Sequence, residues 1–185
     1  MITPNVTSPD DLQALIRRAV KAGADGVQLR QTRWSEQQWL GCWVSIQSLC
    51  EKLGVPLILN SPPERLRASA DGLHLSAASL QKMTESGALQ ALRAVLSARG
   101  IWLSASCHSD SELALAQVQG LDWVTLSPVE KTVSHPEQAP MGWDDFESLV
   151  GAATLPVFAL GGMTPELEPK ARACGAQGIA AIGAW

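Results

Sequence analysis

The sequence predicts a small α/β protein of the (β/α)₈ TIM barrel class, and three observations predict it. Short apolar runs alternate with helical patterns, similar segments recur along the chain, and polar residues follow the apolar runs. Alternating strands and helices form parallel sheets with right-handed crossovers. Seven strand runs and a short strand stub at the start of the chain make eight strand–helix units. Eight such units favour a closed barrel. An open doubly wound sheet is the alternative, but no G-x-G-x-x-G segment follows the first strand.

The strands are predicted from a repeated segment and from apolar runs that lie between its copies. Each copy has a turn of small residues followed by a short apolar strand. The copies are AGADGVQLR (22–30), ASADGLHLS (68–76), QGLDWVTLS (119–127) and CGAQGIAAIG (174–183), and the intervening runs cover 55–60, 101–106 and 155–162.

The helices are predicted from apolar spacing and from start signals. Ser35 with Gln38 has the pattern of a capping box. Thr164 before Pro165 has the pattern of an N-cap followed by proline at the first helical position. The predicted helices cover 9–22, 35–53, 109–118 and 164–173.

The two ends of the chain are short for this fold. The chain has 185 residues, whereas such barrels typically have about 250. The first strand is truncated at Met1, and only 183–185 follow the last strand, so we predict no eighth helix. We expect an apolar strip beside strands 8 and 1, covered by a second copy in a homodimer or by an upstream domain. Residues 1–185 then form a single domain, possibly the C-terminal part of a longer natural chain.

The composition excludes several classes of protein. Net charge is −4, no long run of one sign occurs, and 46% of residues are hydrophobic. These values argue against a nucleic-acid or anionic-membrane surface. No apolar stretch reaches the ~18 residues of a membrane span, and no signal peptide is visible. The four cysteines have no CxxC spacing, which indicates thiols in a reducing cytoplasm.

Polar residues gather where the predicted strands end, which is where these barrels carry their chemistry. The histidines His74, His108 and His135 all fall on this face. His74 lies inside a strand run, so a satisfied core histidine is an equal interpretation. The segment 127–142 is the longest loop, and long βα loops are usually functional lids. The strand-end residues are Gln28, Arg30, Asn60, Ser61, His74, Ser106, His108, Ser127, Gly161 and Gly162.

Two glycine segments predict a phosphate site. Gly161 and Gly162 stand between a strand and a predicted helix start, and Gly183 and Ala184 follow the last strand. Glycine lets a phosphate approach backbone N–H groups, and a helix N-terminus adds positive potential. Phosphate binding between loops 7 and 8 recurs in this fold.

The strand-end motifs, in order, resemble those of the thiamine phosphate synthase/TenI superfamily. They are GVQLR, LILN, ADGLHLS, SASCHS, DWVTLSPVEKTVSHP, FALGGMTPE and GIAAIGA, between residues 22 and 184. The resemblance implies a (β/α)₈ barrel that binds a thiazole phosphate. In the synthase branch, a pyrimidine diphosphate is joined to the thiazole phosphate, and pyrophosphate is released with Mg²⁺.

The chain departs from the synthase pattern at charged positions. Thr32 replaces a lysine, and Ser61 and Ser79 replace two metal-binding aspartates. Because Mg²⁺ prefers carboxylates, the resemblance predicts no metal ligand here, and Mg²⁺ as a cofactor only if synthase activity persists. In the long loop, Thr132 and Ser134 match hydroxyl residues that hold the diphosphate, while His135 replaces the next lysine.

The TenI branch is a metal-independent thiazole tautomerase with a histidine acid/base after strand 5. The resemblance therefore assigns catalysis to His108, with Ser106 and Arg30, and substrate binding to Gln28, Asn60, His74, Thr132, Ser134 and His135. A tautomerase is the leading expectation. Weak synthase activity is one alternative. A non-catalytic phosphate-binding domain attached to a Nudix hydrolase is another, since short barrels with a GIxAIxxxW-like tail look like the C-terminal halves of such fusions.

Overall fold

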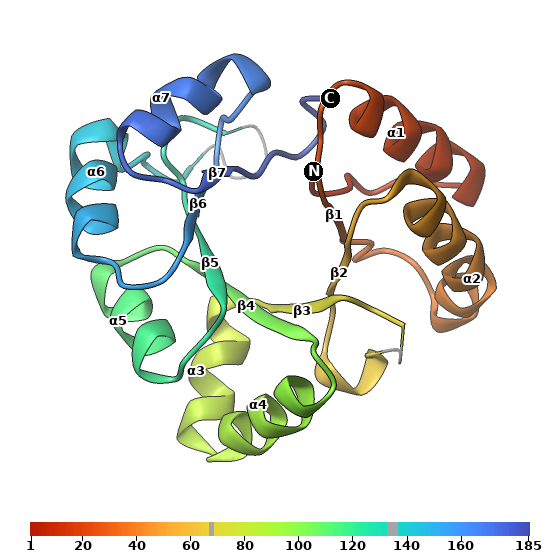
Figure 1. The fold of residues 1–185 in the computed structure, drawn as a ribbon, viewed down its shortest axis with the longest axis horizontal. Coiled ribbons are helices and arrows are strands. Elements are labelled where there is room, and N and C mark those ends of the chain that lie inside the picture. The colour runs from red at the N-terminus through yellow and green to blue at the C-terminus, as the bar shows by residue number, and fades with distance from the viewer. Residues whose placement is uncertain (67–68, 133–136) are drawn as a thin grey trace.

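The computed structural model describes residues 1–66, 69–132 and 137–185, and it confirms the predicted barrel class (Figure 1). The strands are β1 (Val27–Leu29), β2 (Leu57–Asn60), β3 (Gly72–Leu75), β4 (Trp102–Cys107), β5 (Trp123–Leu126), β6 (Val157–Ala159) and β7 (Gly178–Ile179). They form one parallel sheet in chain order. Ile2 takes the place of the truncated first strand and joins the two edges, because it forms parallel bridges with Gln28 and Ile182.

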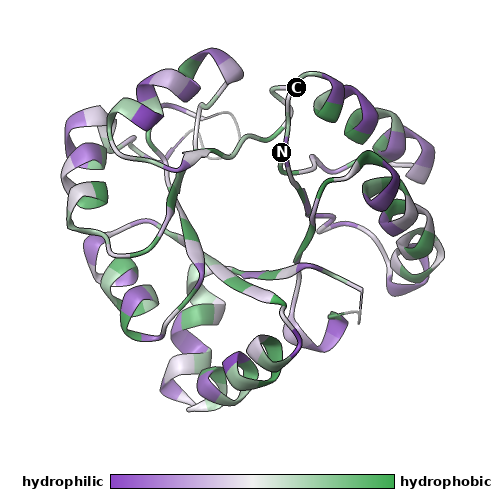
Figure 2. Ribbon diagram, viewed as in Figure 1, coloured by the Kyte–Doolittle hydropathy of each residue, from purple (hydrophilic) through white to green (hydrophobic). Residues whose placement is uncertain are grey.

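Helices surround the strands and present their hydrophilic residues outward (Figure 2). They are α1 (Pro9–Lys21), α2 (Glu36–Leu53), α3 (Ala77–Glu85), α4 (Ala88–Ala98), α5 (Asp110–Val118), α6 (Gly142–Ala152) and α7 (Glu168–Ala173), with 3₁₀ turns η1 (Pro63–Arg65) and η2 (Pro165–Leu167). None of the helices in the described parts of the chain is long and apolar enough to cross a membrane.

The predicted helix starts are confirmed in three cases and corrected in one. The capping box forms at α2, where Ser35 Oγ accepts from the Gln38 N–H and the Gln38 side chain accepts from the Ser35 N–H. The predicted helix 164–173 is instead the 3₁₀ turn η2 followed by a six-residue α7. Pro169 has no N–H to donate to the carbonyl of Pro165, so an α-helical turn cannot run through this segment.

Side chains alternate along each strand between the barrel interior and the helix layer. Leu29 and Leu59 are buried in the outer core, between strands and helices. Their neighbours Gln28 and Asn60 face the interior, where the Asn60 amide contacts the Gln28 amide. The interior of this barrel is therefore partly polar toward the carboxyl ends of the strands.

The flank between β7 and Ile2 is less exposed than the sequence suggests. Ile2 is buried, and its N–H donates to the Ala181 carbonyl at 2.8 Å. No helix of the described residues lies between β7 and Ile2, but Trp185 packs on the core and its carbonyl accepts from Arg18 of α1 at 3.2 Å. The large exposed hydrophobic side chains of the described residues lie elsewhere, at Leu40, Val44, Val95, Trp102 and Val118. A covering partner remains a prediction.

Candidate functional site

A cavity of about 360 Å³ opens at the carboxyl ends of the strands, and we call it the carboxyl-end cavity. Of the predicted site residues, Gln28, Arg30, Asn60, Ser106, His108, Thr132 and Gly161 line it. Ser134 and His135 lie outside the described residues. The structure therefore brings together, around one space, residues from five strands and the loops after them.

Arg30 supplies the positive charge of the cavity. It is the one permanently charged side chain among the described residues that line the space. Its backbone is fixed by Thr3, whose Oγ1 accepts from the Arg30 N–H at 2.9 Å and donates to the Arg30 carbonyl at 3.2 Å. No salt bridge between described residues engages the guanidinium. The charge therefore remains available to a phosphate.

Two carboxamides lie beside each other on the cavity wall. Asn60 Nδ2 donates to Gln28 Oε1 at 3.3 Å. Gln28 is 5% exposed, whereas Asn60, at the end of β2, is half-buried. The bond orients the Asn60 amide and leaves its carbonyl oxygen for a ligand donor.

His108 is held in one orientation by the loop after β5. Its Nδ1 lies 2.8 Å from the Ser127 carbonyl oxygen, which can only accept, so Nδ1 carries the proton. In the neutral ring, Nε2 then carries the lone pair. His108 is exposed, and its backbone N–H donates to the Glu112 carboxylate at the start of α5. This geometry suits an imidazole that accepts or returns a proton at Nε2.

His74 does not line the cavity but lies in the core beneath it, so its contact with substrate stays a prediction that this structure does not support. It is 1% exposed and stacks on Trp123 with ring centroids 5.3 Å apart. Burial lowers the pKa of its imidazole to about 3, so the ring is neutral. The cause is that β3 turns this side chain into the barrel interior, below the polar rim.

His74 instead supports Ser106. Ser104 Oγ donates to the Leu73 carbonyl at 3.3 Å, so it accepts from His74 Nδ1 at 2.8 Å. The other nitrogen, Nε2, then accepts from Ser106 Oγ at 3.0 Å. The Ser106 hydroxyl hydrogen is thereby directed into the core, and its lone pairs are left toward the cavity.

The glycine segment after β6 lies against the loop after β5. The Val129 N–H donates to the Leu160 carbonyl at 2.9 Å, and the Glu130 N–H donates to the Gly161 carbonyl at 3.0 Å. A Cβ at Gly161 would lie 2.7 Å from Pro128 Cα, and one at Gly162 would lie 2.6 Å from Glu130 Cβ. Both residues have positive φ. Only glycine permits this close approach of two backbones.

The predicted phosphate site is assembled in part. Gly161 and Ile182 line the cavity, which brings the loops after β6 and β7 to one space. Gly162, Gly183 and Ala184 do not line it. Because η2 and a short α7 replace the predicted helix, a helix dipole contributes less here, and backbone N–H groups remain the available anion donors.

The Mg²⁺ that the resemblance implies for a synthase does not fit the residues present. Among the described residues, no group of three or more His, Cys, Asp or Glu side chains could hold a metal ion. Ser76 Oγ caps α3 by accepting from the Ser79 N–H and lies 2.9 Å from Ser79 Oγ, while Ser61 Oγ donates weakly to the Pro62 carbonyl. These neutral hydroxyls already have local partners and are poor ligands for a hard cation.

Sequence reasoning missed part of the cavity wall. Ser76 and Gln138 also line it, as does Ser127, which the sequence placed on this face without a role in binding. Ser76 directly follows a strand, a signal that could have assigned it to the site. Gln138 comes from the long loop after β5, and no local sequence signal assigns this particular residue to the wall.

Comparisons with known proteins identify the family to which this chain is similar. A family model described as thiamine monophosphate synthase matches residues 1–185. A putative thiamine-phosphate synthase from Geobacter sulfurreducens is 33% identical over 176 residues, which are 94% of this chain and 79% of the relative. A thiamine-phosphate synthase from Methanocella arvoryzae is 30% identical, over 92% of this chain and 77% of its own. Against the Synechococcus sp. (strain CC9605) thiamine-phosphate synthase, identity is 29% and the chain spans 49% of the relative's length.

A solved structure agrees on the fold. The thiamine phosphate pyrophosphorylase from Pyrococcus furiosus matches with a TM-score of 0.78 and 20% identity, covering 98% of this chain and 83% of that one. The family model covers every residue of the sequence, and the Geobacter relative is similar over most of both chains. The chain therefore belongs to the thiamine monophosphate synthase family.

Proposed function

We propose that this chain binds a thiazole phosphate in the carboxyl-end cavity and joins it slowly to a pyrimidine diphosphate, as a thiamine phosphate synthase of low turnover. The observation that carries the proposal is the cavity itself, where Arg30, the Gln28–Asn60 amide pair and the Gly161 backbone surround one space. The relatives named thiamine-phosphate synthase support this reading over the tautomerase expected from the sequence.

Each group has a role that follows from its position. Backbone N–H groups of the Gly161 loop hold the thiazole phosphate. Arg30 neutralises the diphosphate as its bond to the pyrimidine methylene breaks and the thiazole nitrogen forms the new bond. The Gln28 and Asn60 amides orient the polar edge of a ring, and the lone pairs of Ser106 accept from it.

Turnover is expected to be low because charge is missing around the leaving diphosphate. Ser61, Ser79 and Thr32 stand where the resemblance expects two carboxylates and a lysine. Removing a single group that stabilises developing charge costs about 3 kcal/mol. The reaction therefore depends on Arg30 and on backbone dipoles, and we assign no step to a metal ion.

Restoring the carboxylates tests this proposal. The double variant Ser61→Asp/Ser79→Asp, assayed with Mg²⁺, should form thiamine phosphate about 10²-fold faster than the unaltered chain. The rate is measured by chromatography of the product. A matched control places the same two charges on exposed helix positions, Ser45→Asp/Ser148→Asp, and should leave the rate unchanged. Thiamine phosphate formation absent from both the unaltered chain and the restored variant would refute the proposal.

A second candidate is proton transfer on a carboxythiazole phosphate, the tautomerase reaction. The observation that favours it is the fixed orientation of His108, with Nδ1 on the Ser127 carbonyl and Nε2 left as a base. His108→Asn should then abolish tautomerisation and retain thiazole phosphate binding within about threefold. Ser109→Ala, next to it at the cap of α5, is the control for local disruption. Equal turnover by the unaltered chain and the His108 variant would remove His108 from this role.

Ligand binding without turnover would instead favour the sensor domain expected beside a Nudix hydrolase. The same assays report that outcome, because binding and product formation are measured separately.

A further inference from the structure

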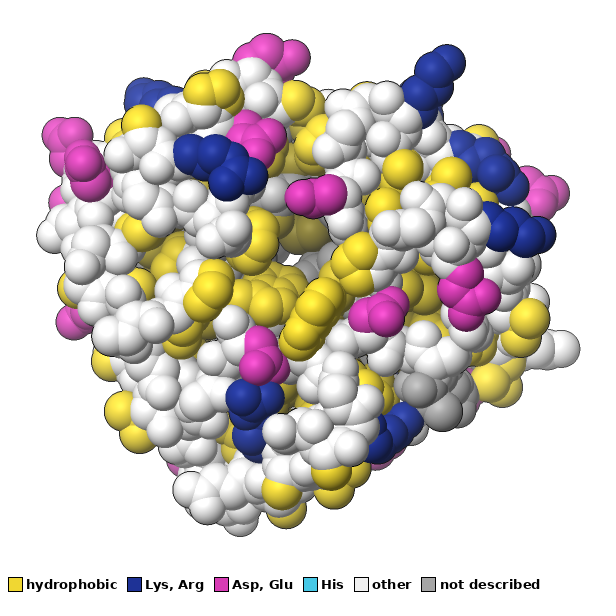
Figure 3. Space-filling view, in the orientation of Figure 1, with side chains coloured by type: hydrophobic (Ala, Val, Ile, Leu, Met, Phe, Trp, Pro, Cys, Tyr) yellow, Lys and Arg dark blue, Asp and Glu magenta, His cyan; other side chains and the backbone are white. Residues whose placement is uncertain are grey.

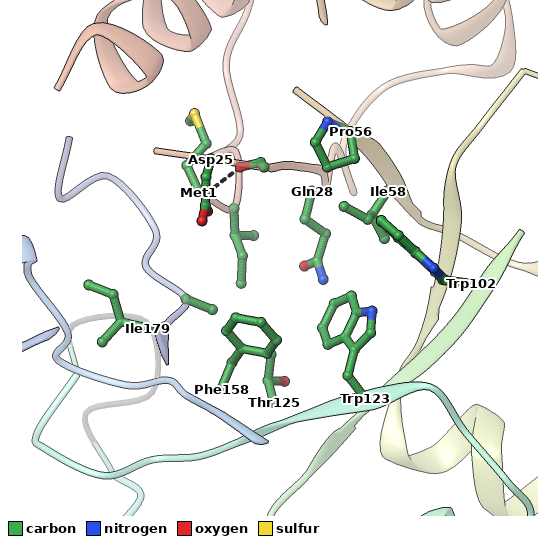
Figure 4. Close-up of a pocket in the computed structure, with 13 residues that line it drawn as sticks. Met1, Asp25, Gln28, Pro56, Ile58, Trp102, Trp123, Thr125, Phe158 and Ile179 are labelled. Atoms are coloured by element: carbon green, nitrogen blue, oxygen red, sulfur yellow. Dashed lines mark hydrogen bonds between the residues drawn. The ribbon is translucent and has the colours of Figure 1, made fainter. Parts of the chain in front are cut away.

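A second cavity opens at the opposite, amino-terminal end of the barrel. Its volume is about 270 Å³, and we call it the amino-end cavity. Figure 3 shows a hollow at the centre of this face with hydrophobic side chains around it. The members of its wall that matter below are Asp25, Trp102, Trp123, Thr125, Phe158 and Ala180 (Figure 4).

The cavity exists because small residues stand where a barrel usually has large ones. Barrel interiors are normally filled by layers of bulky side chains such as Val, Ile and Leu. Here Gly26 and Ala180 line the amino-terminal end. A Cβ at Gly26 would meet only Pro56, at an ordinary 3.6 Å. Close packing therefore does not require glycine at this position, and the space is left open.

Aromatic rings form much of the wall. Trp123 and Phe158 meet edge to face, with ring centroids 5.4 Å apart and planes at 74°. Trp102, at the first position of β4, is 45% exposed, which is unusual for so large an apolar side chain. A partly exposed aromatic wall of this kind suits a flat aromatic ligand, because pairs of aromatic rings are stabilised by more than the burial of their apolar surface.

One polar atom of the wall has no partner. Thr125 is fully buried, and its Oγ1 forms no hydrogen bond with any described residue. An unsatisfied buried hydroxyl costs about 1–3 kcal/mol, so such groups in native proteins call for an explanation. A ligand with a hydrogen-bonding group would supply the partner.

The charge at the mouth is negative. Asp25, which is exposed, belongs to the same repeat as Asp71 and Asp122. Those two carboxylates accept from the Leu57 and Leu103 N–H groups at 2.8 and 2.6 Å. Asp25 forms no such bond with a described residue, and its carboxylate lies at the cavity, where its charge acts on the Met1 amino group. The nearby Met1 amino group donates to the Gly26 carbonyl, and burial lowers its pKa to about 6.

We propose that the amino-end cavity is a second ligand site, which takes a small planar aromatic cation: the ring lies among Trp102, Trp123 and Phe158, and the cationic group meets Asp25. The volume supports a single substituted ring, because benzene binds in an apolar cavity of about 150 Å³ in another protein. The site is separate from the carboxyl-end cavity, although Ile2 and Gln28 line both.

Benzamidine is the probe, with neutral benzamide and anionic benzoate as isosteres. Each is titrated into the full chain at pH 8, and the indole N–H signals of Trp102 and Trp123 are followed by NMR. We expect both signals to shift and saturate with benzamidine, and benzoate to bind about tenfold more weakly. Absence of saturable shifts at Trp102 and Trp123, or equal binding of benzoate, would each overturn the proposal.

Variants locate the ligand. Ala180→Leu fills the cavity and should abolish the shifts, whereas Ala173→Leu, on the exposed side of α7, should keep them. Thr125→Val removes the unpaired hydroxyl without changing the shape of the side chain, and should weaken benzamidine by about threefold while leaving the fold intact. Equal affinity in Ala180→Leu and Ala173→Leu contradicts the site. If Ala180→Leu does not fold, unchanged affinity in Thr125→Val and Asp25→Asn contradicts it equally.

Discussion

Gly161→Ala should lower the free energy of unfolding by about 3 kcal/mol and remove most of the affinity for thiazole phosphate. The new Cβ would lie 2.7 Å from Pro128 Cα and 2.8 Å from Pro128 Cβ, at a φ of +91°. The backbone of the loop after β5 cannot yield without breaking the Glu130 N–H to Gly161 carbonyl bond. Urea unfolding and calorimetric titration with thiazole phosphate measure the two effects.

Gly183→Ala is the matched control. Gly183 also has a positive φ, of +71°, but a Cβ there would meet nothing within 4 Å. Gly183→Ala therefore costs only the free energy of placing alanine at a positive φ, about 1 kcal/mol. It should leave the affinity for thiazole phosphate nearly unchanged. If the two variants were equally stable, the close approach of the β5 and β6 loops would have no energetic role.

Acid should destabilise the protein through His74. The pKa of the buried ring falls from 6.5 to about 3 in the folded state. Between pH 6.5 and pH 3, His74 is therefore protonated in the unfolded chain and neutral in the folded chain. Stability is therefore fully present above pH 6.5 and decreases as the pH falls below it. At pH 4 the loss from this group amounts to about 3 kcal/mol. Urea unfolding at pH 7.5 and pH 4 measures the difference.

His74→Gln separates this effect from the titration of carboxylates. The variant loses the Ser104 and Ser106 hydrogen bonds and the stacking on Trp123, so it should be less stable at pH 7.5 by about 2 kcal/mol. It should nevertheless lose about 3 kcal/mol less than the unaltered chain on going to pH 4. His108→Gln, at an exposed histidine, is the control. An unchanged acid sensitivity in His74→Gln would show that the ring is not the cause.

The fold was predictable because its signals are local and repeated. Each copy of the repeated segment places a turn before a strand, and capping residues such as Ser35 mark helix starts that the structure confirms. The closure of the barrel was harder to predict from the sequence, because it depends on the single residue Ile2, which bridges both Gln28 and Ile182. The break between η2 and α7 came from Pro169, whose missing N–H outweighs the N-cap pattern at Thr164.

The sequence predicted which side chains lie near the strand ends, but it predicted less well how deeply each of them is buried. Residues at or just after strand ends, such as Arg30, Ser106 and His108, were assigned to one face, and the structure places them around one cavity. His74 lies in β3 and its ring is buried against Trp123, which no signal in the sequence distinguishes from the cavity-lining Gln28 of β1. The amino-end cavity has no sequence motif, because the small residues that leave it open, Gly26 before β1 and Ala180 after β7, are distant in the chain.

Calorimetric titration of the full chain with thiazole phosphate tests the central claim, which is that the carboxyl-end cavity holds a thiazole phosphate. The unphosphorylated thiazole alcohol is titrated beside it, without added metal. The account predicts saturable binding of the phosphate, with the alcohol at least about tenfold weaker, and loss of that difference in Gly161→Ala. Equal affinity for the two compounds, or no binding of either, would contradict it.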